Sequence, residues 1–511
     1  MGRADPFTGY SFVLRTIVYV VVPAFTVFQY VRLRRALHVF QLEAYKRPNY
    51  LRWLGSNPKR ARFLAPAPGK KPLVMTGRAW RILVVATLLS LLGVLIPAAV
   101  AHLVLGGAPA DLIAWALTTA ALYVWGPLLI PAADVLLTPF QKAVNARFVR
   151  AARARLERVN PVVVGITGSY GKTSTKFAVG RLLGDEDEVL VTPGSFNTTM
   201  GVCRTINEQL RPGHGFFVVE MGARQAGDIA ELGRLVRHTV AVLTSIGTAH
   251  LESFGSREEI RRAKLEVVET LAPGGLAVVN SDDIVVRAAA AGLSTERVIR
   301  YGLDAAGDPD VTATEVEVAR DGTRFTVVER GSGREVAVST RLLGRHSIGH
   351  VLAGVAVATG LGRELEELVA AIEALEPVEH RLQLIEGAGG VTVIDDAFNS
   401  NPEGAAAALE VLAAMPARKR VVVTPGMVEL GELQREENVR FGRAAAEVAD
   451  VLVVVAPPNR EALLEGAASA SGGARVIAVA SLDEATKELA GILGAGDAVL
   501  FENDLPDQYE G

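Results

Sequence analysis

The sequence predicts a chain of two α/β domains with mostly parallel sheets, preceded by an α-helical transmembrane region. Three observations lead to this fold class. From residue 161 onward, apolar runs of strand length alternate with helical runs. A glycine-rich turn, Thr167-Gly-Ser-Tyr-Gly-Lys-Thr173, separates the first of these strands from a helix. Residues 82–140 contain no Lys or Arg and are apolar enough to lie in a membrane.

Length and charge limit the function classes. A chain of 511 residues is long enough for about three domains. Its single cysteine, Cys203, excludes a disulfide framework and a Cys-rich zinc module, and it is consistent with a reducing compartment. Residues 1–160 carry 21 Lys/Arg and 5 Asp/Glu, which leaves 32 and 51 for the remainder, so the two parts have net charges of +16 and −19. This asymmetry favours contact with an anionic inner leaflet over nucleic acid.

A membrane region is predicted over residues 1–158, with spans at about 10–31, 82–105 and 112–137. Residues 106–111 separate the last two spans, and Pro127 and Pro131 are expected to kink the third. The run at 10–31 contains Arg15, Pro23 and Gln29, so an interfacial helix or a signal sequence stays open there.

The loops predict the orientation. The loop 32–81 holds 13 Lys/Arg and one acidic residue, Glu43, and residues 141–160 are basic as well. The positive-inside rule then places this loop and the catalytic domains in the cytoplasm of a bacterial-type cell, with a multi-pass anchor in the cell membrane. Aromatic and basic residues alternate over 41–53. This pattern fits an interfacial belt, and the alternative is a site for an anionic lipid-linked substrate.

The glycine-rich turn is interpreted as a phosphate-binding loop. Four apolar β-formers precede it, and the amphipathic run Phe177 to Leu183 follows it. Backbone N–H groups of such a loop surround an anion, the helix N-terminus adds positive potential, and Lys172 reaches the outer phosphates. Ile166 stands where the strict Walker pattern has glycine. The loop residues expected at the nucleotide are Thr167, Gly168, Ser169, Tyr170, Gly171, Lys172, Thr173 and Ser174.

The ends of two further strands carry side chains that could serve a metal. Glu220 closes the run Phe216–Glu220, and with the hydroxyl of Thr173 it is a natural Mg²⁺ ligand. His250 follows the run at 240–246, where spacing alone also allows a simple polar role in a loop. Lys264 lies in a charged helical run that by itself indicates a solvated helix face.

The two α/β domains are predicted over 159–378 and 379–511. The first is a P-loop central domain with a mostly parallel sheet, and two turn signals at 320–323 and 330–333 add a small antiparallel sheet. The second is a smaller, Rossmann-like C-terminal domain. Asp395-Asp396 follows one of its strands, where a carboxylate binds ribose hydroxyls or caps a helix.

Seven motifs together resemble the Mur ligase family from about Pro161 to the end of the chain. They are the loop Thr167–Thr173, Asn197-Thr-Thr-Met-Gly201, Glu220-Met-Gly-Ala-Arg-Gln-Ala-Gly-Asp228, His250-Leu-Glu-Ser-Phe-Gly255 with Ala263-Lys-Leu-Glu266, Gly344-Arg-His-Ser347, Asp395-Asp-Ala-Phe-Asn-Ser-Asn-Pro402 and Met427-Val-Glu-Leu-Gly-Glu432. The most similar branch of the family adds D-alanyl-D-alanine to a muramyl tripeptide.

The resemblance implies a role for each candidate residue. Lys172 and the loop amides hold the phosphates of ATP, Thr173 and Glu220 bind Mg²⁺, and His250 binds a second Mg²⁺. Lys264 is carbamylated and steadies that second metal. The remaining roles fall to five residues: His346 near the adenine, Arg381 at the phosphates, Asp396 at the ribose, and Asn399 and Asn401 in the nucleotide cleft.

The predicted function is a membrane-anchored, ATP-dependent amide ligase of cell-wall precursor synthesis. It joins an amino acid or dipeptide to a carboxylate acceptor through an acyl phosphate. Two departures from the family bear on the substrates: membrane spans stand where the family has its UDP-binding domain, and the end Phe501–Tyr509 is acidic. A lipid-linked acceptor is therefore a hypothesis. The alternatives are a ligase for another polymer of the poly-γ-glutamate kind, a folylpolyglutamate-type ligase, and a membrane ATPase that forms no amide.

Overall fold

The computed structural model describes residues 22–63, 72–105, 108–293, 295–319, 322–455 and 457–504 of the chain. The chain divides into two compact units, of which the first ends at Ala146 and the second begins at Arg147. The second unit contains a nine-stranded and a six-stranded sheet. The part with strands β1–β9 is called the central domain below, and the part with strands β10–β15 the C-terminal domain.

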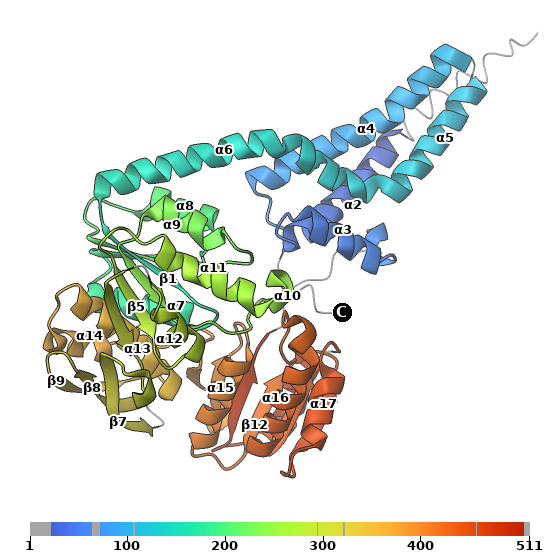
Figure 1. Cartoon of the computed structure of the whole chain (residues 1–511). Helices are drawn as coiled ribbons and strands as arrows, with labels where there is room; N and C mark the ends of the chain where they lie inside the picture. Colours follow the sequence, from blue (N-terminus) through green and yellow to red (C-terminus); the bar gives the residue numbers. More distant parts are fainter. Residues whose placement is uncertain are drawn as a thin grey trace, which may run out of the picture. The chain divides into compact units, whose positions relative to one another are not determined.

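The first unit is helical (Figure 1). Its elements are α2 (Val22–Leu42), α3 (Arg47–Ser56), η2 (Arg60–Arg62), α4 (Gly77–Leu105), α5 (Ala108–Trp125), η3 (Gly126–Leu128) and the start of α6 (Leu129–Val159). By length and composition alone, Gly77–Ala101 and Ile113–Val159 are long and apolar enough to cross a membrane. Of the first predicted span, residues 10–21 lie outside the described part of the chain, and the rest lies in α2.

The kink expected at Pro127 is present as the 3-10 turn η3, which separates α5 from α6, whereas Pro131 lies in the first turn of α6. Helix α2 satisfies the carbonyl groups at the end of α5. Gln29 Nε2 donates to Leu122 O at 2.9 Å, and Arg32 Nη2 donates to Tyr123 O at 2.9 Å. Both side chains are buried, so these polar residues serve as a cap on the C-terminus of α5.

The sheet of the central domain has the strand order β2-β3-β1-β4-β5-β6-β7-β8-β9. Strands β2 to β7 pair in parallel, and β7, β8 and β9 pair antiparallel, which confirms the small antiparallel sheet predicted from the two turn signals. The strands are β1 (Val162–Thr167), β2 (Val189–Val191), β3 (Phe216–Glu220), β4 (Val240–Leu243), β5 (Leu276–Asn280), β6 (Arg297–Tyr301), β7 (Val311–Ala319), β8 (Gly322–Glu329) and β9 (Arg334–Thr340).

Helices cover both faces of this sheet, which is why its central strands are apolar on both sides (Figure 1). Val179 of α7 and Val355 of α13 belong to the core on one face. Leu232 of α9 and Val267 of α11 belong to the core on the other. The helices are α7 (Lys172–Leu183), α8 (Thr199–Gln209), α9 (Asp228–Val236), α10 (Leu251–Phe254), α11 (Arg257–Glu269), α12 (Ile284–Ala290), α13 (Arg345–Gly360) and α14 (Val369–Glu373), with η4 (Ala305–Gly307) and η5 (Leu365–Leu368).

The C-terminal domain has the strand order β10-β11-β15-β12-β13-β14, with β10 antiparallel and the others parallel. This is the Rossmann-like arrangement that the alternation of strands and helices predicts. Its elements are β10 (Gln383–Glu386), η6 (Ala388–Gly390), β11 (Thr392–Asp396), α15 (Pro402–Ala414), β12 (Arg420–Thr424), η7 (Gly431–Leu433), α16 (Gln434–Val448), β13 (Val451–Val455), α17 (Arg460–Ala468), β14 (Arg475–Val479), α18 (Leu482–Ile492) and β15 (Ala498–Glu502).

Candidate active site

The loop between β1 and α7 requires glycine at two positions. Gly171, the N-cap of α7, has φ of +76°, which is in the left-handed region. A Cβ on Gly168 would lie 2.0 Å from the hydroxyl oxygen of Thr244, so only glycine lets the loop approach the end of β4. The first N–H groups of a helix have no intrahelical acceptor, and the helix dipole makes this end positive. The loop and the start of α7 thus have the geometry of an anion-binding site.

Other side chains of the loop tie it to the neighbouring strand ends. Thr167 Oγ1 donates to Met221 O at 2.8 Å. Gly247 N donates to Ser169 Oγ at 2.9 Å. These hydroxyl groups, which the sequence assigns to the nucleotide, therefore also fix the loop against the segments that follow β3 and β4.

Lys172 lies over the loop, where its Nζ donates to Gly168 O at 2.8 Å and to Ser169 O at 3.1 Å. Burial lowers the pKa of Lys172 to about 8, against the opposing effect of Glu220 and with a further lowering by Arg381. A bound anion would favour the charged form. The ammonium group thus lies beside the anion-binding loop, and its pKa depends on whether an anion occupies the loop.

Glu220 is the centre of a buried polar cluster at the end of β3. Its Oε2 accepts from Thr173 Oγ1 at 3.0 Å and pairs with Lys176 Nζ at 3.1 Å, while its Oε1 accepts from Asn197 Nδ2 at 2.9 Å. Burial raises the pKa of Glu220, but Lys176, Lys172 and the Asn197 hydrogen bond outweigh this effect and lower it. The carboxylate is therefore ionised. The structure brings Thr173 and Glu220 together, and two oxygen ligands beside a phosphate loop suit Mg²⁺.

Lys176 is a further residue of this site, beyond those predicted from the sequence. It is one helical turn after Lys172 on α7, and its side chain is fully buried. Residues four apart lie on the same helix face, so this spacing was the available signal.

His250 contacts a carboxylate of the C-terminal domain. Its Nδ1 lies 2.5 Å from Oε2 of Glu429, and no hydrogen bond joins it to Thr173 or Glu220 in the described residues. Of the predicted metal ligands, Thr173 and Glu220 are therefore hydrogen-bonded to each other, whereas His250 is hydrogen-bonded to Glu429 instead. Among the described residues, no group of three or more His, Cys, Asp and Glu side chains is arranged to hold a metal ion.

Lys264 is buried rather than solvated, so the interpretation of its helix run as an exposed charged face is wrong at this position. Helix α11 turns its other charged residues outward, whereas Lys264 and Glu266 face inward. Burial lowers the pKa of Lys264 well below its usual value, and nearby Lys172 lowers it further, against the carboxylates of Asp228, Glu220 and Glu266. Within the described residues its amino group makes no hydrogen bond or ion pair, so it is available as a neutral amine.

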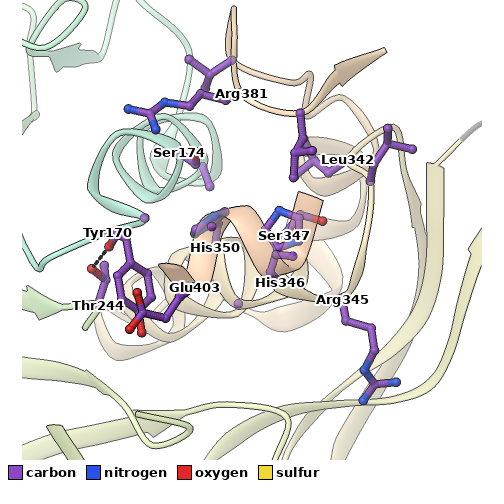
Figure 2. A pocket seen from close by; sticks show the side chains of 18 of the residues that line it. Tyr170, Ser174, Thr244, Leu342, Arg345, His346, Ser347, His350, Arg381 and Glu403 are labelled. Atoms are coloured by element: carbon purple, nitrogen blue, oxygen red, sulfur yellow. Dashed lines mark hydrogen bonds between the residues drawn. The ribbon is translucent and has the colours of Figure 1, made fainter. Parts of the chain in front are cut away.

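A cavity of about 440 Å³ lies between the central and C-terminal domains, within the second unit (Figure 2). Eight of the residues predicted to bind the nucleotide line it: Tyr170, Gly171, Ser174, His346, Arg381, Asp396, Asn399 and Asn401. Lys172 and Thr173 are not among the lining residues. His350 and Glu403 line the cavity and were not predicted; His350 lies one turn after His346 on α13. A cavity of this size and polarity is typical of a small-molecule site.

The two histidines on α13 present neutral rings to this cavity (Figure 2). Burial lowers the pKa of His350 to about 3, with contributions from His346 and Arg381. The surrounding protein also lowers the pKa of His346 to about 4, although the cavity leaves that side chain open. His350 Nδ1 lies 3.0 Å from Thr175 Oγ1. Uncharged aromatic rings beside a polar wall suit a base more than a phosphate.

The C-terminal domain contributes the other wall of the cavity. The Arg381 guanidinium lies 4.4 Å from the ring centroid of Phe398. Asp396 Oδ1 accepts from Leu382 N at 3.1 Å. Asn401 Oδ1 accepts from Gly404 N and caps α15. Since Asn401 provides the cap, the alternative that Asp395 or Asp396 caps this helix is wrong.

Comparison with known proteins adds independent evidence. Residues 166–358 match the Mur ligase middle domain, and residues 380–502 match the Mur ligase glutamate ligase domain. A UDP-N-acetylmuramoyl-tripeptide–D-alanyl-D-alanine ligase of Mycobacterium tuberculosis (strain H37Rv) is 36% identical over 381 residues, which cover 70% of this chain and 74% of the relative.

Solved structures show the same relationship. MurF from Acinetobacter baumannii is 31% identical and superposes with a TM-score of 0.62 over 70% of this chain and 77% of that one. MurF from Thermotoga maritima, in a complex with ADP, is 27% identical with a TM-score of 0.64 over 72% of this chain and 82% of that one.

Proposed function

The chain belongs to the Mur ligase family, and we propose that it is a membrane-anchored, ATP-dependent ligase that joins D-alanyl-D-alanine, or a related amino acid or dipeptide, to a carboxylate acceptor in peptidoglycan precursor synthesis. The observation that carries this proposal is the cavity between a phosphate loop and a second α/β domain, with Tyr170 and Ser174 on one wall and Arg381 and Asp396 on the other. Relatives of 36% and 35% identity are named as UDP-N-acetylmuramoyl-tripeptide–D-alanyl-D-alanine ligases.

ATP would bind in this cavity, with its phosphates at the loop. The N–H groups at the start of α7 and the ammonium of Lys172 would hold them, and Arg381 would reach them from the C-terminal domain. Asp396 would accept hydrogen bonds from the ribose, with Asn399 and Asn401 nearby, and His346 would lie beside the adenine. These assignments are the ones that the family resemblance implies, and every residue among them except Lys172 lines the cavity.

Two Mg²⁺ ions would complete the site, and the residues present fit them. Thr173 and Glu220 offer oxygen ligands that already lie 3.0 Å apart. The Lys264 amine is buried, free of partners in the described residues and lowered in pKa, which are the conditions under which an amine adds CO₂ to become a carbamate. Together with a ring nitrogen of His250, this carboxylate would form the second site. Bound Mg²⁺ would offset the negative charge that accumulates during phosphoryl transfer.

The reaction brings two anions together. A carboxylate oxygen of the acceptor attacks the γ-phosphorus of ATP, and ADP leaves. The amine of the second substrate then attacks the carbonyl carbon of the acyl phosphate, and inorganic phosphate leaves as the amide forms and the amine loses a proton. The cationic groups of Lys172 and Arg381 reduce the repulsion between the reactants, so most of the catalysis is positioning and charge stabilisation.

Membrane anchoring is supported by the surface of α4 and α5. Leu103 is 83% exposed, Leu117 is 66% exposed and Ile96 is 56% exposed, and further leucines and valines along these helices are open as well. Soluble proteins rarely expose so long an apolar surface. With the basic loop 32–81 on the cytoplasmic side, the central and C-terminal domains would work in the cytoplasm, close to an anionic leaflet. A membrane-held acceptor, including a lipid-linked one, would then be close to the site.

The test is formation of a new amide by the full-length protein in detergent or vesicles. We expect ADP and product to form only when ATP, an acceptor carboxylate and an amine are all present, with Lys172→Ala inactive. UDP-muramyl tripeptide and a lipid-linked muramyl tripeptide are compared as acceptors with D-alanyl-D-alanine as amine. Phosphate release that is independent of both substrates would contradict ligase activity. Full activity on the UDP-linked acceptor alone would contradict the lipid-linked hypothesis and leave the ligase assignment intact.

A further inference from the structure

Glu429 of the C-terminal domain reaches two loops of the central domain. Its Oε2 lies 2.5 Å from Nδ1 of His250, its Oε1 lies 4.0 Å from Nη2 of Arg224, and its backbone oxygen accepts from Glu252 N at 3.4 Å. These partners follow β3 and β4, the strands next to β1 in the sheet. Glu429 therefore acts at the strand ends that carry the proposed metal ligands, although it belongs to the other domain.

The loop that carries Glu429 is held by buried amide side chains. Asn438 Oδ1 accepts from Met427 N at 2.8 Å, and Asn438 Nδ2 donates to Met427 O at 2.9 Å. Asn459 Nδ2 donates to the same carbonyl at 3.0 Å, and Asn503 Nδ2 donates to Gly426 O at 2.6 Å. Because these amides are buried, the loop cannot move without loss of several hydrogen bonds. The carboxylate of Glu429 is thus presented by a rigid support.

Both partners of this contact adopt unusual backbone conformations. His250 has φ of +62° and Glu429 has φ of +64°, in the left-handed region that non-glycine residues rarely occupy. Such conformations are energetically unfavourable and persist where the surroundings require them. Here they direct two side chains from different domains toward each other.

The direction of the hydrogen bond determines which ring nitrogen of His250 is free. An ionised carboxylate only accepts hydrogen bonds, so the proton of this contact is on Nδ1, which leaves Nε2 as the ring nitrogen that a metal ion could bind. Nε2 makes no hydrogen bond within the described residues. A histidine that binds a metal through one nitrogen commonly donates from the other to a carboxylate in this way.

We propose that Glu429 is a positioning residue that fixes the ring and tautomer of His250, so that Nε2 is presented to a divalent cation when the C-terminal domain lies against the central domain. This inference rests on the proposed function, in which His250 is a metal ligand. It assigns to Glu429 a link between domain docking and metal binding: the cation is held tightly only when the domain that supplies Arg381 and Asp396 is in place.

The test measures Mn²⁺ binding to the full-length protein with saturating ADP, by the electron paramagnetic resonance signal of free Mn²⁺. Glu429→Ala is expected to weaken one class of bound Mn²⁺ by about 10- to 100-fold, as is typical when the carboxylate partner of a metal-bound histidine is lost. Glu429→Gln keeps an acceptor for Nδ1–H and is expected to retain most of the affinity. The matched control is Glu432→Ala, an exposed acidic residue in the same segment, which is expected to bind as the wild type does.

The double variant His250→Ala/Glu429→Ala distinguishes an effect of Glu429 through His250 from an effect on metal binding that is independent of His250. If Glu429 acts through His250, the double variant binds Mn²⁺ no more weakly than His250→Ala alone. Wild-type affinity in Glu429→Ala, with loss in His250→Ala, would overturn the inference and leave the proposed function standing. Unchanged Mn²⁺ binding in His250→Ala would instead remove His250 from the proposed metal site. Thermal unfolding of each variant identifies any that fails to fold, and Glu429→Gln then carries the test.

Discussion

Lys176 Nζ lies 3.1 Å from Glu220 Oε2, and both side chains are buried beneath the phosphate loop. Lys176 Nζ also donates to Gly194 O at 2.5 Å. The pair keeps the Glu220 carboxylate charged in a site from which water is largely removed. Such a carboxylate can serve a divalent cation, whereas a protonated one cannot.

Removal of the Lys176 ammonium group from this ion pair should destabilise the folded protein. Lys176→Met leaves the charge of Glu220 buried with fewer partners, and we expect a loss of about 3–5 kcal/mol in the free energy of unfolding, measured with urea. The double variant Lys176→Met/Glu220→Gln removes both charges and should recover most of this loss. Equal destabilisation of the single and double variants would show that the ion pair is not the cause.

Nucleotide affinity should fall above about pH 8. Burial and Arg381 lower the pKa of Lys172 to about 8 against the effect of Glu220, so the free protein loses this positive charge as the pH rises. Bound phosphates favour the charged form and raise that pKa, so binding takes up a proton above pH 8. The affinity for ADP should then decrease by up to about tenfold per pH unit.

Calorimetry at pH 7 to 9.5, in buffers of different ionisation enthalpy, measures both the affinity and the proton uptake. Lys172→Met should bind ADP more weakly, with little dependence on pH over this range. The same slope in Lys172→Met and in the wild type would assign the titration to another group.

Short carboxylic acids should rescue the loss of Lys264. The carbamate hypothesis makes this side chain a carboxylate, so Lys264→Ala should lose about 10²–10³-fold in ligase rate and regain part of it with formate or acetate. Lys172→Ala is the matched control, because its missing group is a cation that a carboxylate cannot replace. Lack of rescue in Lys264→Ala at any acid size would remove the main support for the carbamate.

The local sequence was sufficient to predict the elements and several strand-end residues. Strand β3 has the predicted bounds, because a continuous apolar run between turn residues leaves little choice of register. The loop at Thr167–Thr173 was recognisable because its glycines and Lys172 are close in sequence. Glu220 was found because ligands gather at the carboxyl ends of parallel strands.

What the sequence did not reveal depends on packing between distant segments. Lys264 and its exposed neighbours look alike in a charged run, and only the phase of α11 against the sheet buries Lys264 and Glu266. Glu429 meets His250 across 179 residues of chain through two left-handed residues, which no local pattern indicates. The four-residue spacing from Lys172 along α7 indicates Lys176, but its partner Glu220 lies on β3, which no pattern within the helix indicates.

Glu502 should make the protein less stable as the pH rises. It is paired in register with Asp396 on the adjacent strand, fully buried, and its Oε1 accepts from Ser400 Oγ at 2.5 Å. Burial raises the pKa of Glu502 well above its usual value, and Asp396 raises it further. The folded state therefore holds a proton that the unfolded state releases above about pH 4.5. Because the pKa of Glu502 is higher in the folded state, its protonation stabilises the fold fully only below about pH 4.5. The free energy of unfolding therefore falls as the pH rises from about 4.5 toward the pKa of the folded state.

Glu502→Gln should remove this dependence, because the amide keeps an acceptor for Ser400 and a donor for Asp396 without a charge. We expect the variant to have a higher Tm than the wild type at pH 7 and a smaller difference in Tm at pH 5. A change of 1 kcal/mol in the free energy of unfolding corresponds to about 2–4 °C in Tm. The exposed Glu386→Gln on β10 is the control. A difference between Glu502→Gln and the wild type that does not change with pH would contradict the assignment.

Charges placed on the exposed faces of α4 and α5 should release the protein from membranes. Helix α4 has 29 residues and α5 has 18. At 1.5 Å per residue their lengths are about 43 and 27 Å, so the pair is of the scale of the apolar layer of a bilayer, about 30 Å. An acidic residue at the centre of an inserted helix costs about 2.5–3.5 kcal/mol.

Ile96→Asp and Leu117→Asp are therefore each expected to reduce the fraction retained in vesicles of mixed neutral and anionic lipid by about 100-fold in partition constant. Leu51→Asp on α3 is the matched control: Leu51 is 47% exposed in the same unit but lies outside the two helices. Retention is measured by flotation before and after an alkaline carbonate wash, with circular dichroism to verify helix content. Retention that high salt abolishes equally in all four proteins would show that the basic loop binds the surface and that α4 and α5 do not enter the lipid.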